Sequence, residues 1–353
     1  MLNEKLLIDA KANLRDALKR LDEGAERILF VVDEHSHLLG TLTDGDARRA
    51  LLDGRDLTAA ITGIYNIAPI SFCITDNYMD AVREVFTRRK ITHIPLLDTE
   101  GVIVDCLRPE SLTDSSEVSP GRSTVIDLPV IIMAGGKGTR MAPFTNVLPK
   151  PLIPIGDKTI IELIMDEFAR YGVRDFRLTL NYKGEMIRAY FQGSEREYNI
   201  SYAWEKDFLG TAGSIRLVTN LGDTFIVSNC DILVKADFGE VISFHKQNKA
   251  ALTIISSIQH HKVPYGVVDF GQGGRVNGIR EKPEFTFPIN TGVYVLDKLC
   301  LDFIPEGVSF NMTDLIDALL CSGKAVYTFP INEGDYLDIG QWEEYRRVVS
   351  SLS

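Results

Sequence analysis

The sequence predicts an α/β protein with two parts: an N-terminal pair of β-β-α repeats, and a larger Rossmann-like domain with a mixed, mostly parallel sheet. Three observations lead to this prediction. Within the first 110 residues, a pattern of apolar positions recurs without gaps after 65 residues. A segment rich in Ser, Thr, Asp, Glu, Pro and Gly then interrupts all periodicity. Beyond it, short β-branched runs alternate with amphipathic helical patterns, as in parallel sheets that are covered on both faces.

The domain boundaries follow from these changes in pattern. Residues 1–60 and 61–115 form the two repeats, 116–127 is a linker, and 128–353 is the second domain. In the first repeat, a helical apolar face ends at Gly24, and a strand and a second apolar run follow. Corresponding helix positions in the two copies are Leu14 and Met79, Ala17 and Val82, and Leu21 and Phe86. Two such units, each with an apolar face, would pack against one another.

Two segments of the repeats, Gly40–Asp46 and, in the second copy, His93–Pro95, resemble a tandem CBS domain pair. In such pairs a threonine and an aspartate commonly hold the ribose of an adenine nucleotide, and the resemblance assigns these roles to Thr43 and Asp46. The same two side chains would also cap the helix that begins there. Nucleotide binding and plain capping therefore both stay open.

The second copy departs from the CBS pattern, because Arg108 stands where Thr43 stood and Ser111 where Asp46 stood. At most one ordinary nucleoside site per chain is therefore expected, and Arg108 is suited to a phosphate instead. The apolar helical faces can satisfy each other within one chain. The repeat alone thus leaves open whether the protein forms a homo-oligomer.

The second domain begins with a short apolar strand, Val130–Ala134, which is followed by three glycines within four positions. Glycines let backbone N–H groups come close to a polyphosphate. Arg140 and Lys150 add positive charge in the same segment. A flexible surface turn is the alternative, but the ordered pattern of glycines, basic residues and prolines favours a phosphate site.

This segment consists of Gly135–Arg140 followed by Pro143 and Leu148–Pro151, and it resembles the signature of sugar-1-phosphate nucleotidyltransferases. It is not a Walker loop, because the Gly-Lys-Ser/Thr ending is absent, nor is it a dinucleotide fingerprint. The resemblance extends from about Leu128 to the C-terminus, since later family segments recur in order. It implies a nucleotide-diphospho-sugar transferase domain that transfers a nucleotidyl group to a sugar 1-phosphate.

The resemblance also implies a nucleotide site. Leu209–Ser214 is a small-residue turn that looks more like the turn of guanylyltransferases than the Gly-Leu-Ala-Gln segment of thymidylyl and many uridylyl enzymes. GTP is therefore favoured over UTP and dTTP. The nearest overall resemblance is to CBS-containing guanylyltransferases that activate amino-hexose 1-phosphates for surface sugars such as legionaminic acid. The nucleotide-binding residues implied are Ala134, Gly135, Gly136, Gly138, Thr139, Asn181, Glu205, Gly210, Thr211 and Ala212.

Two aspartates are the expected ligands of Mg²⁺. Phe225–Asp231 is an apolar strand that ends in an acid, and a carboxylate there is costly unless it is solvated or bound to a cation. By resemblance, Asp231 is the family's magnesium-binding aspartate. Asp338 is the second, in a segment like the family's W-x-D-x-G motif. Either one alone could be an ordinary strand-end or turn acid, but two oxygen ligands with several waters suit Mg²⁺ and a nucleotide.

The sugar side is implied by three later segments. By resemblance, Glu281 and Asn290 contact the sugar, and Lys282 binds its phosphate. Gly266 allows close backbone approach, and Thr291 follows Asn290 at the polar edge of a strand. Glu281 and Lys282 could also be an ordinary solvated charge pair at the end of a hairpin.

The implied reaction needs no nucleophilic side chain, because an oxygen of the sugar 1-phosphate attacks the α-phosphorus of the nucleotide. The protein must position two anions and neutralise charge on the transferring phosphoryl group. Arg140, Lys150 and Lys282 are therefore the expected catalytic residues: Arg140 on the triphosphate, Lys150 on phosphate at the approach side, and Lys282 on the attacking phosphate.

Composition limits other functions. A net charge of −11 argues against a general nucleic-acid surface. Five scattered cysteines without C-x-x-C spacing indicate reduced thiols, and no signal peptide or membrane-spanning run is visible, so we expect a cytoplasmic protein. Two other function classes stay open. One is a nucleotide-sensing regulator with an inactive transferase domain, and the other is a bifunctional transferase, which would need a hexapeptide-repeat β-helix.

Overall fold

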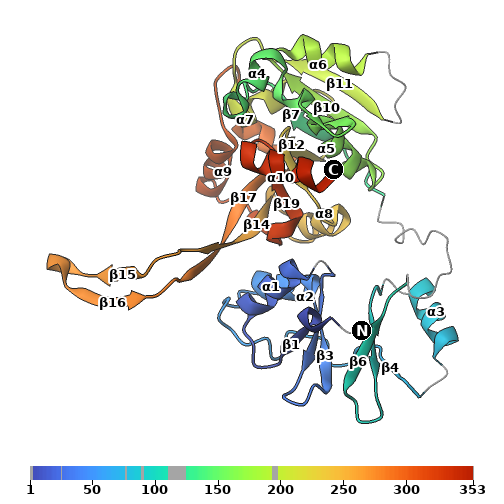
Figure 1. Ribbon diagram of the computed structural model, residues 1–353. Coiled ribbons are helices and arrows are strands. Elements are labelled where there is room, and N and C mark those ends of the chain that lie inside the picture. The colour runs from blue at the N-terminus through green and yellow to red at the C-terminus, as the bar shows by residue number, and fades with distance from the viewer. Residues whose placement is uncertain are drawn as a thin grey trace. The chain divides into compact units, whose positions relative to one another are not determined.

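The computed structural model describes residues 3–24, 26–75, 78–88, 91–109, 125–192 and 198–352. The chain divides into two compact units (Figure 1). The first unit consists of residues 1–121 together with residues 260–286, and the second consists of residues 122–259 and 287–353. The expected linker at 116–127 lies largely outside the described residues, as does Ser111.

The first repeat is a three-stranded sheet with two helices. Strand β1 (Leu7–Asp9) pairs parallel with β2 (Ile28–Val32), which pairs antiparallel with β3 (Leu38–Thr43). Helix α1 (Leu14–Glu23) buries the apolar face that its sequence predicts, and α2 (Asp44–Leu52) follows β3 directly. The first of the two expected β-β-α units is therefore confirmed.

The second repeat reproduces the first one strand by strand. Strand β4 (Phe72–Cys73) pairs parallel with β5 (Ile94–Leu97), and β5 pairs antiparallel with β6 (Ile103–Leu107). Helix α3 (Met79–Arg88) corresponds to α1. Each repeat has one irregularity of register, after Val31 in the first and after Leu96 in the second. These positions are 65 residues apart, so the structure confirms the spacing of the repeat.

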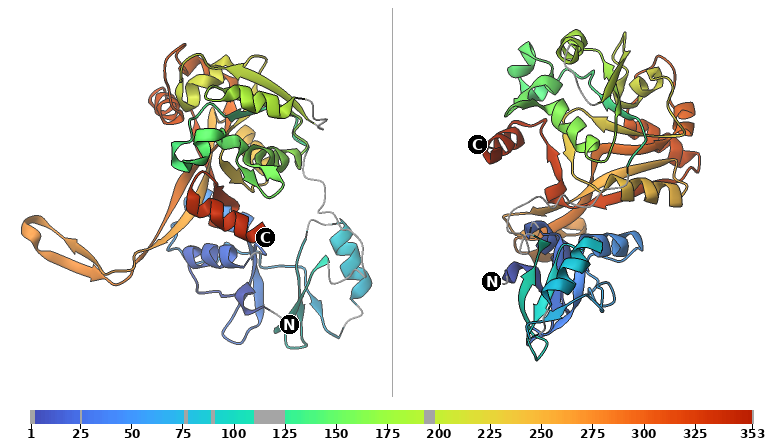
Figure 2. Two further views of the ribbon diagram at one scale, coloured as in Figure 1. Left: turned by 45° about the horizontal axis from the view of Figure 1, so that its top comes forward. Right: turned by 90° about the vertical axis from the view of Figure 1, so that its right-hand side faces the viewer.

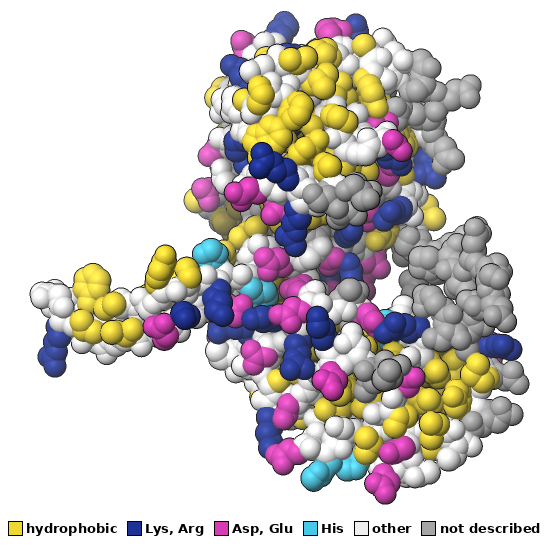
Figure 3. All heavy atoms as spheres, viewed as in Figure 1, with side chains coloured by type: hydrophobic (Ala, Val, Ile, Leu, Met, Phe, Trp, Pro, Cys, Tyr) yellow, Lys and Arg dark blue, Asp and Glu magenta, His cyan; other side chains and the backbone are white. Residues whose placement is uncertain are grey.

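The first unit also contains a two-stranded hairpin, made of β15 (Val267–Phe270) and β16 (Val276–Arg280). Cross-strand pairs such as Val268 with Ile279 and Phe270 with Val276 put apolar side chains on this hairpin. All four side chains are exposed, and Figure 3 shows hydrophobic atoms gathered on the hairpin surface.

The second unit is built on a seven-stranded sheet with the order β11-β10-β7-β12-β17-β14-β18. The strands from β11 to β12 are parallel, whereas β17 runs antiparallel to β12. The mixed, mostly parallel sheet is thus confirmed. Its strands are β7 (Val130–Met133), β10 (Asp175–Leu180), β11 (Asn199–Trp204), β12 (Thr224–Asn229), β14 (Leu252–Lys262), β17 (Glu284–Asp297) and β18 (Val326–Ile331).

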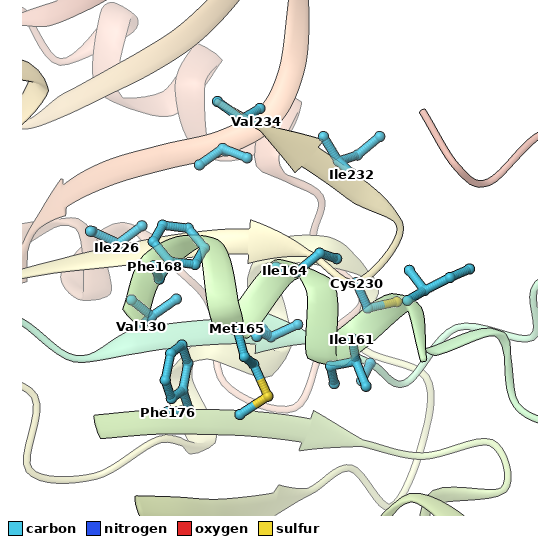
Figure 4. Packing of buried hydrophobic residues seen from close by; sticks show 14 of the residues in the cluster. Val130, Ile161, Ile164, Met165, Phe168, Phe176, Ile226, Cys230, Ile232 and Val234 are labelled. Carbon is cyan, nitrogen blue, oxygen red and sulfur yellow. The ribbon is translucent and has the colours of Figure 1, made fainter. Parts of the chain in front are cut away.

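Helices cover both faces of this sheet (Figure 2). Every residue of strand β7 is therefore buried, which explains why its sequence is apolar without interruption. Val130 and Ile132 point to one core, and Ile131 and Met133 point to the other. In the first core, α5 (Ile160–Ala169) packs Phe168 and its neighbours over the strands (Figure 4). The flanking helices are α6 (Gly184–Phe191), α7 (Gly210–Gly213), α8 (Phe238–Gln247) and α9 (Met312–Cys321).

Short elements complete the second unit. They are α4 (Phe144–Val147), β8 (Pro154–Ile155), β9 (Lys158–Thr159), β13 (Ile232–Val234), β19 (Tyr336–Asp338) and α10 (Trp342–Leu352). Strand β13 pairs antiparallel with β19 next to the end of β12. Among the described residues, no helix is long and apolar enough to cross a lipid bilayer.

Candidate active site

A pocket of about 260 Å³ lies in the second unit, at the carboxyl ends of β7, β10 and β12. This edge of a parallel sheet is where ligands commonly bind, because loops and helix N-termini converge there. Its lining residues come from the glycine turn, from Lys150, from Glu205, from α7 and from the segment that follows β12. They are Met133, Gly135, Gly136, Gly138, Thr139, Arg140, Lys150, Thr179, Glu205, Phe208, Gly210, Thr211, Ser214, Asn229, Cys230 and Asp231.

The glycines of the turn are needed because other groups pack against them. Gly138 has φ +64°, and a Cβ there would lie 2.9 Å from the Cβ of Lys150. A Cβ on Gly135 would collide with Oε1 of Glu205. Two glycines of the turn therefore allow close contacts within the protein: Gly138 with the side chain of Lys150, and Gly135 with the side chain of Glu205.

The charged centre of the pocket is the carboxylate of Asp231. The ammonium group of Lys150 is buried and forms an ion pair with Asp231 Oδ2. The guanidinium of Arg140, which is largely exposed, lies 3.8 Å from the same oxygen. Two cations thus converge on one carboxylate, where they could also bind the oxygens of a polyphosphate.

The carboxylate of Asp338, the second expected metal ligand, lies near that of Asp231, and Gly340 is next to both. A Cβ on Gly340 would lie 2.5 Å from Asp231 Oδ2, 2.8 Å from Asp338 Oδ1, and still closer to Lys150 Nζ. The pairing of Ile232 with Asp338 across β13 and β19 brings the two carboxylates together. The structure therefore places both predicted aspartates around one point.

This donor set fits a divalent metal ion that a nucleotide brings with it. Within the described residues, no cluster of three or more His, Cys, Asp or Glu side chains could hold a metal ion alone. Two carboxylates leave room for phosphate oxygens and water, which Mg²⁺ prefers as its remaining ligands.

The thiol of Cys230, next to Asp231, supplies no nucleophile. Burial, together with the negative charge of Asp231, raises its pKa to about 12. The thiol therefore stays protonated at neutral pH.

Glu205 is a buried acid in the wall of the pocket. Burial raises its pKa, although the N–H of Leu209 donates a hydrogen bond of 3.1 Å to Oε2 and opposes the rise. The side chain of Asn181 donates to the backbone oxygen of Glu205 at 3.1 Å. Asn181 thus holds the backbone at Glu205. The other two expected nucleotide-binding residues, Ala134 and Ala212, are buried in the two cores of the second unit.

The expected sugar residues Asn290 and Thr291 lie on β17, close to the pocket residue Asn229. A Cβ on the next residue, Gly292, would collide with Asn229 Nδ2. The hydroxyl of Thr291 is buried and donates to the carbonyl of Ile255 at 2.6 Å, so it joins two strands. Asn290 donates to the hydroxyl of Tyr294 at 2.9 Å.

The other expected sugar residues, Gly266, Glu281 and Lys282, belong to the hairpin segment that groups with the first unit. A Cβ on Gly266 would lie 3.0 Å from Glu281 Oε2, so these two residues are neighbours. Lys282 has a positive φ of 44°. The pocket lining described above comes from elsewhere in the chain, and the roles of these three residues stay predictions.

The CBS ligand candidates Thr43 and Asp46 form a complete capping box at the start of α2. Asp46 Oδ2 accepts the Thr43 N–H at 2.9 Å and the Thr43 hydroxyl at 2.6 Å. In the second repeat, Arg108 forms an ion pair with Glu26 of the first repeat, and His93 Nε2 lies 2.7 Å from Glu26 Oε2. The capping role is thus confirmed. Arg108 has a carboxylate partner, and a phosphate beside it stays a prediction.

Sequence reasoning missed several residues of the pocket wall. Phe208 is 57% exposed although it lines the pocket. An aromatic side chain beside a small-residue turn was the available signal. Thr179 gave no signal, because only the packing of β10 brings it to the pocket, whereas Ser214 belongs to the small-residue turn that the sequence indicated.

Comparisons with known proteins agree with this geometry. The family model described as "Nucleotidyl transferase" matches residues 129–353, and the CBS domain model matches residues 1–53. Both matches agree with the resemblances found in the sequence.

Two curated relatives and one solved structure illustrate the similarity. A mannose-1-phosphate guanyltransferase of Yarrowia lipolytica is 34% identical over 224 residues, 61% of each chain. A UTP–glucose-1-phosphate uridylyltransferase of Synechocystis sp. is 29% identical over 245 residues, 62% of this chain and 63% of the relative. The crystal structure of HddC from Yersinia pseudotuberculosis has a TM-score of 0.51 and 27% identity, and the match covers 64% of this chain and all of HddC.

The chain thus spans less than two thirds of the length of these curated relatives. The family model itself covers more than half of this chain. The chain therefore belongs to the nucleotidyl transferase family and carries a CBS domain at its N-terminal end.

Proposed function

We propose that the protein transfers a nucleotidyl group from a nucleoside triphosphate to a sugar 1-phosphate and releases pyrophosphate. The observation that carries this proposal is the convergence of Asp231, Asp338 and Lys150 at Gly340, beside a glycine turn. Relatives that act on mannose 1-phosphate and glucose 1-phosphate support the substrate class. The test is pyrophosphate release when the protein is mixed with nucleoside triphosphates, Mg²⁺ and hexose 1-phosphates. Absence of release from every combination would contradict the proposal.

The reaction is an in-line displacement. A phosphate oxygen of the sugar 1-phosphate bonds to the α-phosphorus, and the bond from that phosphorus to the β-phosphate oxygen breaks. Arg140 stabilises the triphosphate and the charge that develops on it, and Lys150 binds phosphate oxygens on the approach side. Nucleotidyl transferases generally use a divalent metal ion. Mg²⁺ held by Asp231 and Asp338 would neutralise phosphate charge here.

GTP is the proposed nucleotide, and Glu205 supports this choice. Guanine presents two adjacent donors on one edge, N1–H and the 2-amino group, which match the two oxygens of a carboxylate. Uracil and thymine present a single N3–H between two carbonyl oxygens, which a carboxylate would repel. Phe208 offers an exposed aromatic face in the same pocket wall, on which a base could stack.

The nucleotide choice is tested with GTP, UTP, dTTP and ATP against several hexose 1-phosphates. GTP should give the highest kcat/KM, and Glu205→Gln should lower kcat/KM for GTP by roughly tenfold or more, since a charge-assisted pair of hydrogen bonds is lost. Lys206→Gln, at the next position, is the matched control. Turnover with UTP or dTTP but not with GTP would contradict the assignment.

A pH profile sharpens this test. Only the ionised carboxylate of Glu205 accepts both guanine donors, and burial raises its pKa above the ordinary value of 4.5. As the pH falls through that raised pKa, the affinity for GTP should decrease. Glu205→Gln has no ionisation there, so its affinity should lack this acidic decrease. Parallel profiles for the two proteins would show that Glu205 does not read the base.

We also propose that any adenine nucleotide acts through Thr43 and Asp46. If so, AMP or ATP should change the affinity for substrate by ~5- to 150-fold in the full chain, and Asp46→Ala should abolish the change. If the two residues serve only as a cap, Asp46→Ala should lower the free energy of unfolding by about 1 kcal/mol and leave kcat and both KM values unaltered. An AMP effect that survives Asp46→Ala would place the effector elsewhere.

A further inference from the structure

The hairpin formed by β15 and β16 cannot be stable by itself. Two isolated strands are at best marginally stable in water, and every residue of β16 is exposed. Residues 260–286 nevertheless group with the CBS repeats as one compact unit. The contacts that hold this segment must therefore lie at its base, where β14 ends and β17 begins.

Helix α1 of the first CBS repeat supplies these contacts. The ammonium group of Lys19 donates to both carboxylate oxygens of Glu284, at 3.2 and 3.1 Å. Its pKa is raised, first of all by this hydrogen bond. One turn further along α1, Asp22 Oδ2 lies 3.6 Å from Nε2 of His260. We name the group of Lys19, Asp22, His260 and Glu284 the clasp.

The clasp joins the two strands of the hairpin base to each other and to the helix. His260 stands on β14 and Glu284 on β17, and Nδ1 of His260 lies 3.0 Å from the hydroxyl of Thr286 on β17. The side chains of Asp22 and His260 are only 12% and 6% exposed, so water screens their interaction poorly. Helix α1 is itself fixed, because its opposite face is buried in the first repeat.

The clasp lies beside the residues expected to bind the sugar phosphate. Glu284 follows Lys282 by two positions. Between them, the carbonyl of Pro283 accepts the N–H of Val263 at 2.9 Å, which closes the hairpin base. The left-handed backbone of Lys282 needs such surroundings, because an isolated lysine seldom keeps a positive φ. Any motion of the base therefore moves Glu281 and Lys282.

We propose that Lys19 and Asp22, on the first helix of the CBS repeat, are positioning residues for the sugar 1-phosphate, because they fix the hairpin base that carries Glu281 and Lys282. This inference rests on the proposed transferase function. It gives the N-terminal unit a role in the reaction that requires no nucleotide at Thr43 and Asp46. The clasp should contribute to the binding of sugar 1-phosphate only, because Glu281 and Lys282 are the residues expected to contact that substrate.

The test is steady-state kinetics of the full chain with Lys19→Glu, Asp22→Asn and the charge swap Lys19→Glu/Glu284→Lys. Lys11→Glu is the matched control, because Lys11 forms an exposed ion pair with Glu34 in the same unit. Lys19→Glu and Asp22→Asn should raise the KM for sugar 1-phosphate by about 5-fold or more, with kcat and the KM for GTP unchanged. The charge swap should restore much of the loss, and Lys11→Glu should have no effect.

Three results would contradict the proposed role of the clasp. The first is an unchanged KM for sugar 1-phosphate in both single variants. The second is an equal change in both KM values and kcat, which indicates a general structural defect. The third is an equal effect of Lys11→Glu. Lys19 is 42% exposed, so Lys19→Glu tests the clasp even if Asp22→Asn does not fold. Failure of the proposed function differs from all three, because the unaltered protein would then release no pyrophosphate.

Discussion

The nucleotide side and the sugar side of the proposed site are built differently. The nucleotide pocket lies at the ends of three parallel strands of one sheet, and a buried ion pair between Lys150 and Asp231 lies in its wall. The expected sugar residues Glu281 and Lys282 stand on an exposed hairpin that groups with the CBS repeats. The comparison teaches that the residues expected to bind the nucleotide depend on a buried sheet, whereas Glu281 and Lys282, expected to bind the sugar phosphate, depend on a hairpin that the CBS repeats can hold.

The largest effect on activity is expected from a substitution of Asp231, in the nucleotide pocket. Asp231→Asn should lower kcat by about 10³-fold at any substrate concentration, because charge stabilisation in the transition state is lost. Asp223→Asn, just before the opposite end of the same strand β12, is the control and should be active. Initial rates at saturating GTP and Mg²⁺ measure the difference. A near-normal kcat for Asp231→Asn would mean that this residue holds no metal ion.

Gly340→Ala should come next, with a loss of about 10²-fold in kcat, since its Cβ would occupy the point where two carboxylates and Lys150 meet. Gly334→Ala is a matched control, because its Cβ would meet no heavy atom within 4 Å. The same assay compares the two variants. Equal activity would show that the carboxylates can move apart at no cost to the reaction.

On the sugar side, Lys282→Ala should raise the KM for sugar 1-phosphate by about tenfold and leave the KM for GTP unaltered. Arg275→Ala, near the turn of the same hairpin, is the control for loss of an exposed cation. Both KM values are obtained by varying one substrate at a time. A change in the KM for GTP alone would reverse the assignment of the two sides.

The smallest effect is expected from removal of the CBS repeats. Residues 125–353 should retain transferase activity with kcat close to that of the full chain, but with a KM for sugar 1-phosphate raised by about 5-fold. Titration of both substrates against the truncated protein measures this. An inert truncation would mean that the repeats complete the active fold itself.

Much of this architecture could be predicted from the sequence because the signals are local. The glycine turn, the 65-residue repeat and the strand that ends at Asp231 all depend on short patterns. Family order linked Asp231 with Asp338, and the pairing of β13 with β19 places them together.

The remaining features depend on contacts between distant parts of the chain. Nothing near Glu205 indicates its burial, and nothing in the spacing links Lys19 to Glu284, which follows it by 265 residues. The capping role of Thr43 likewise could be confirmed only from the hydrogen bonds themselves. Such features follow from tertiary packing, which propensity and periodicity do not encode.

The ion pair between Arg108 and Glu26 links the two copies of the repeat. Arginine in the second copy stands where the first copy has Thr43, its carboxylate partner comes from the first copy, and His93 lies beside the same carboxylate. Separating the copies would leave the carboxylate of Glu26 without Arg108, and an ion pair that loses one partner is destabilising. We therefore expect the two copies to unfold together, and either copy expressed alone to be less stable than the pair.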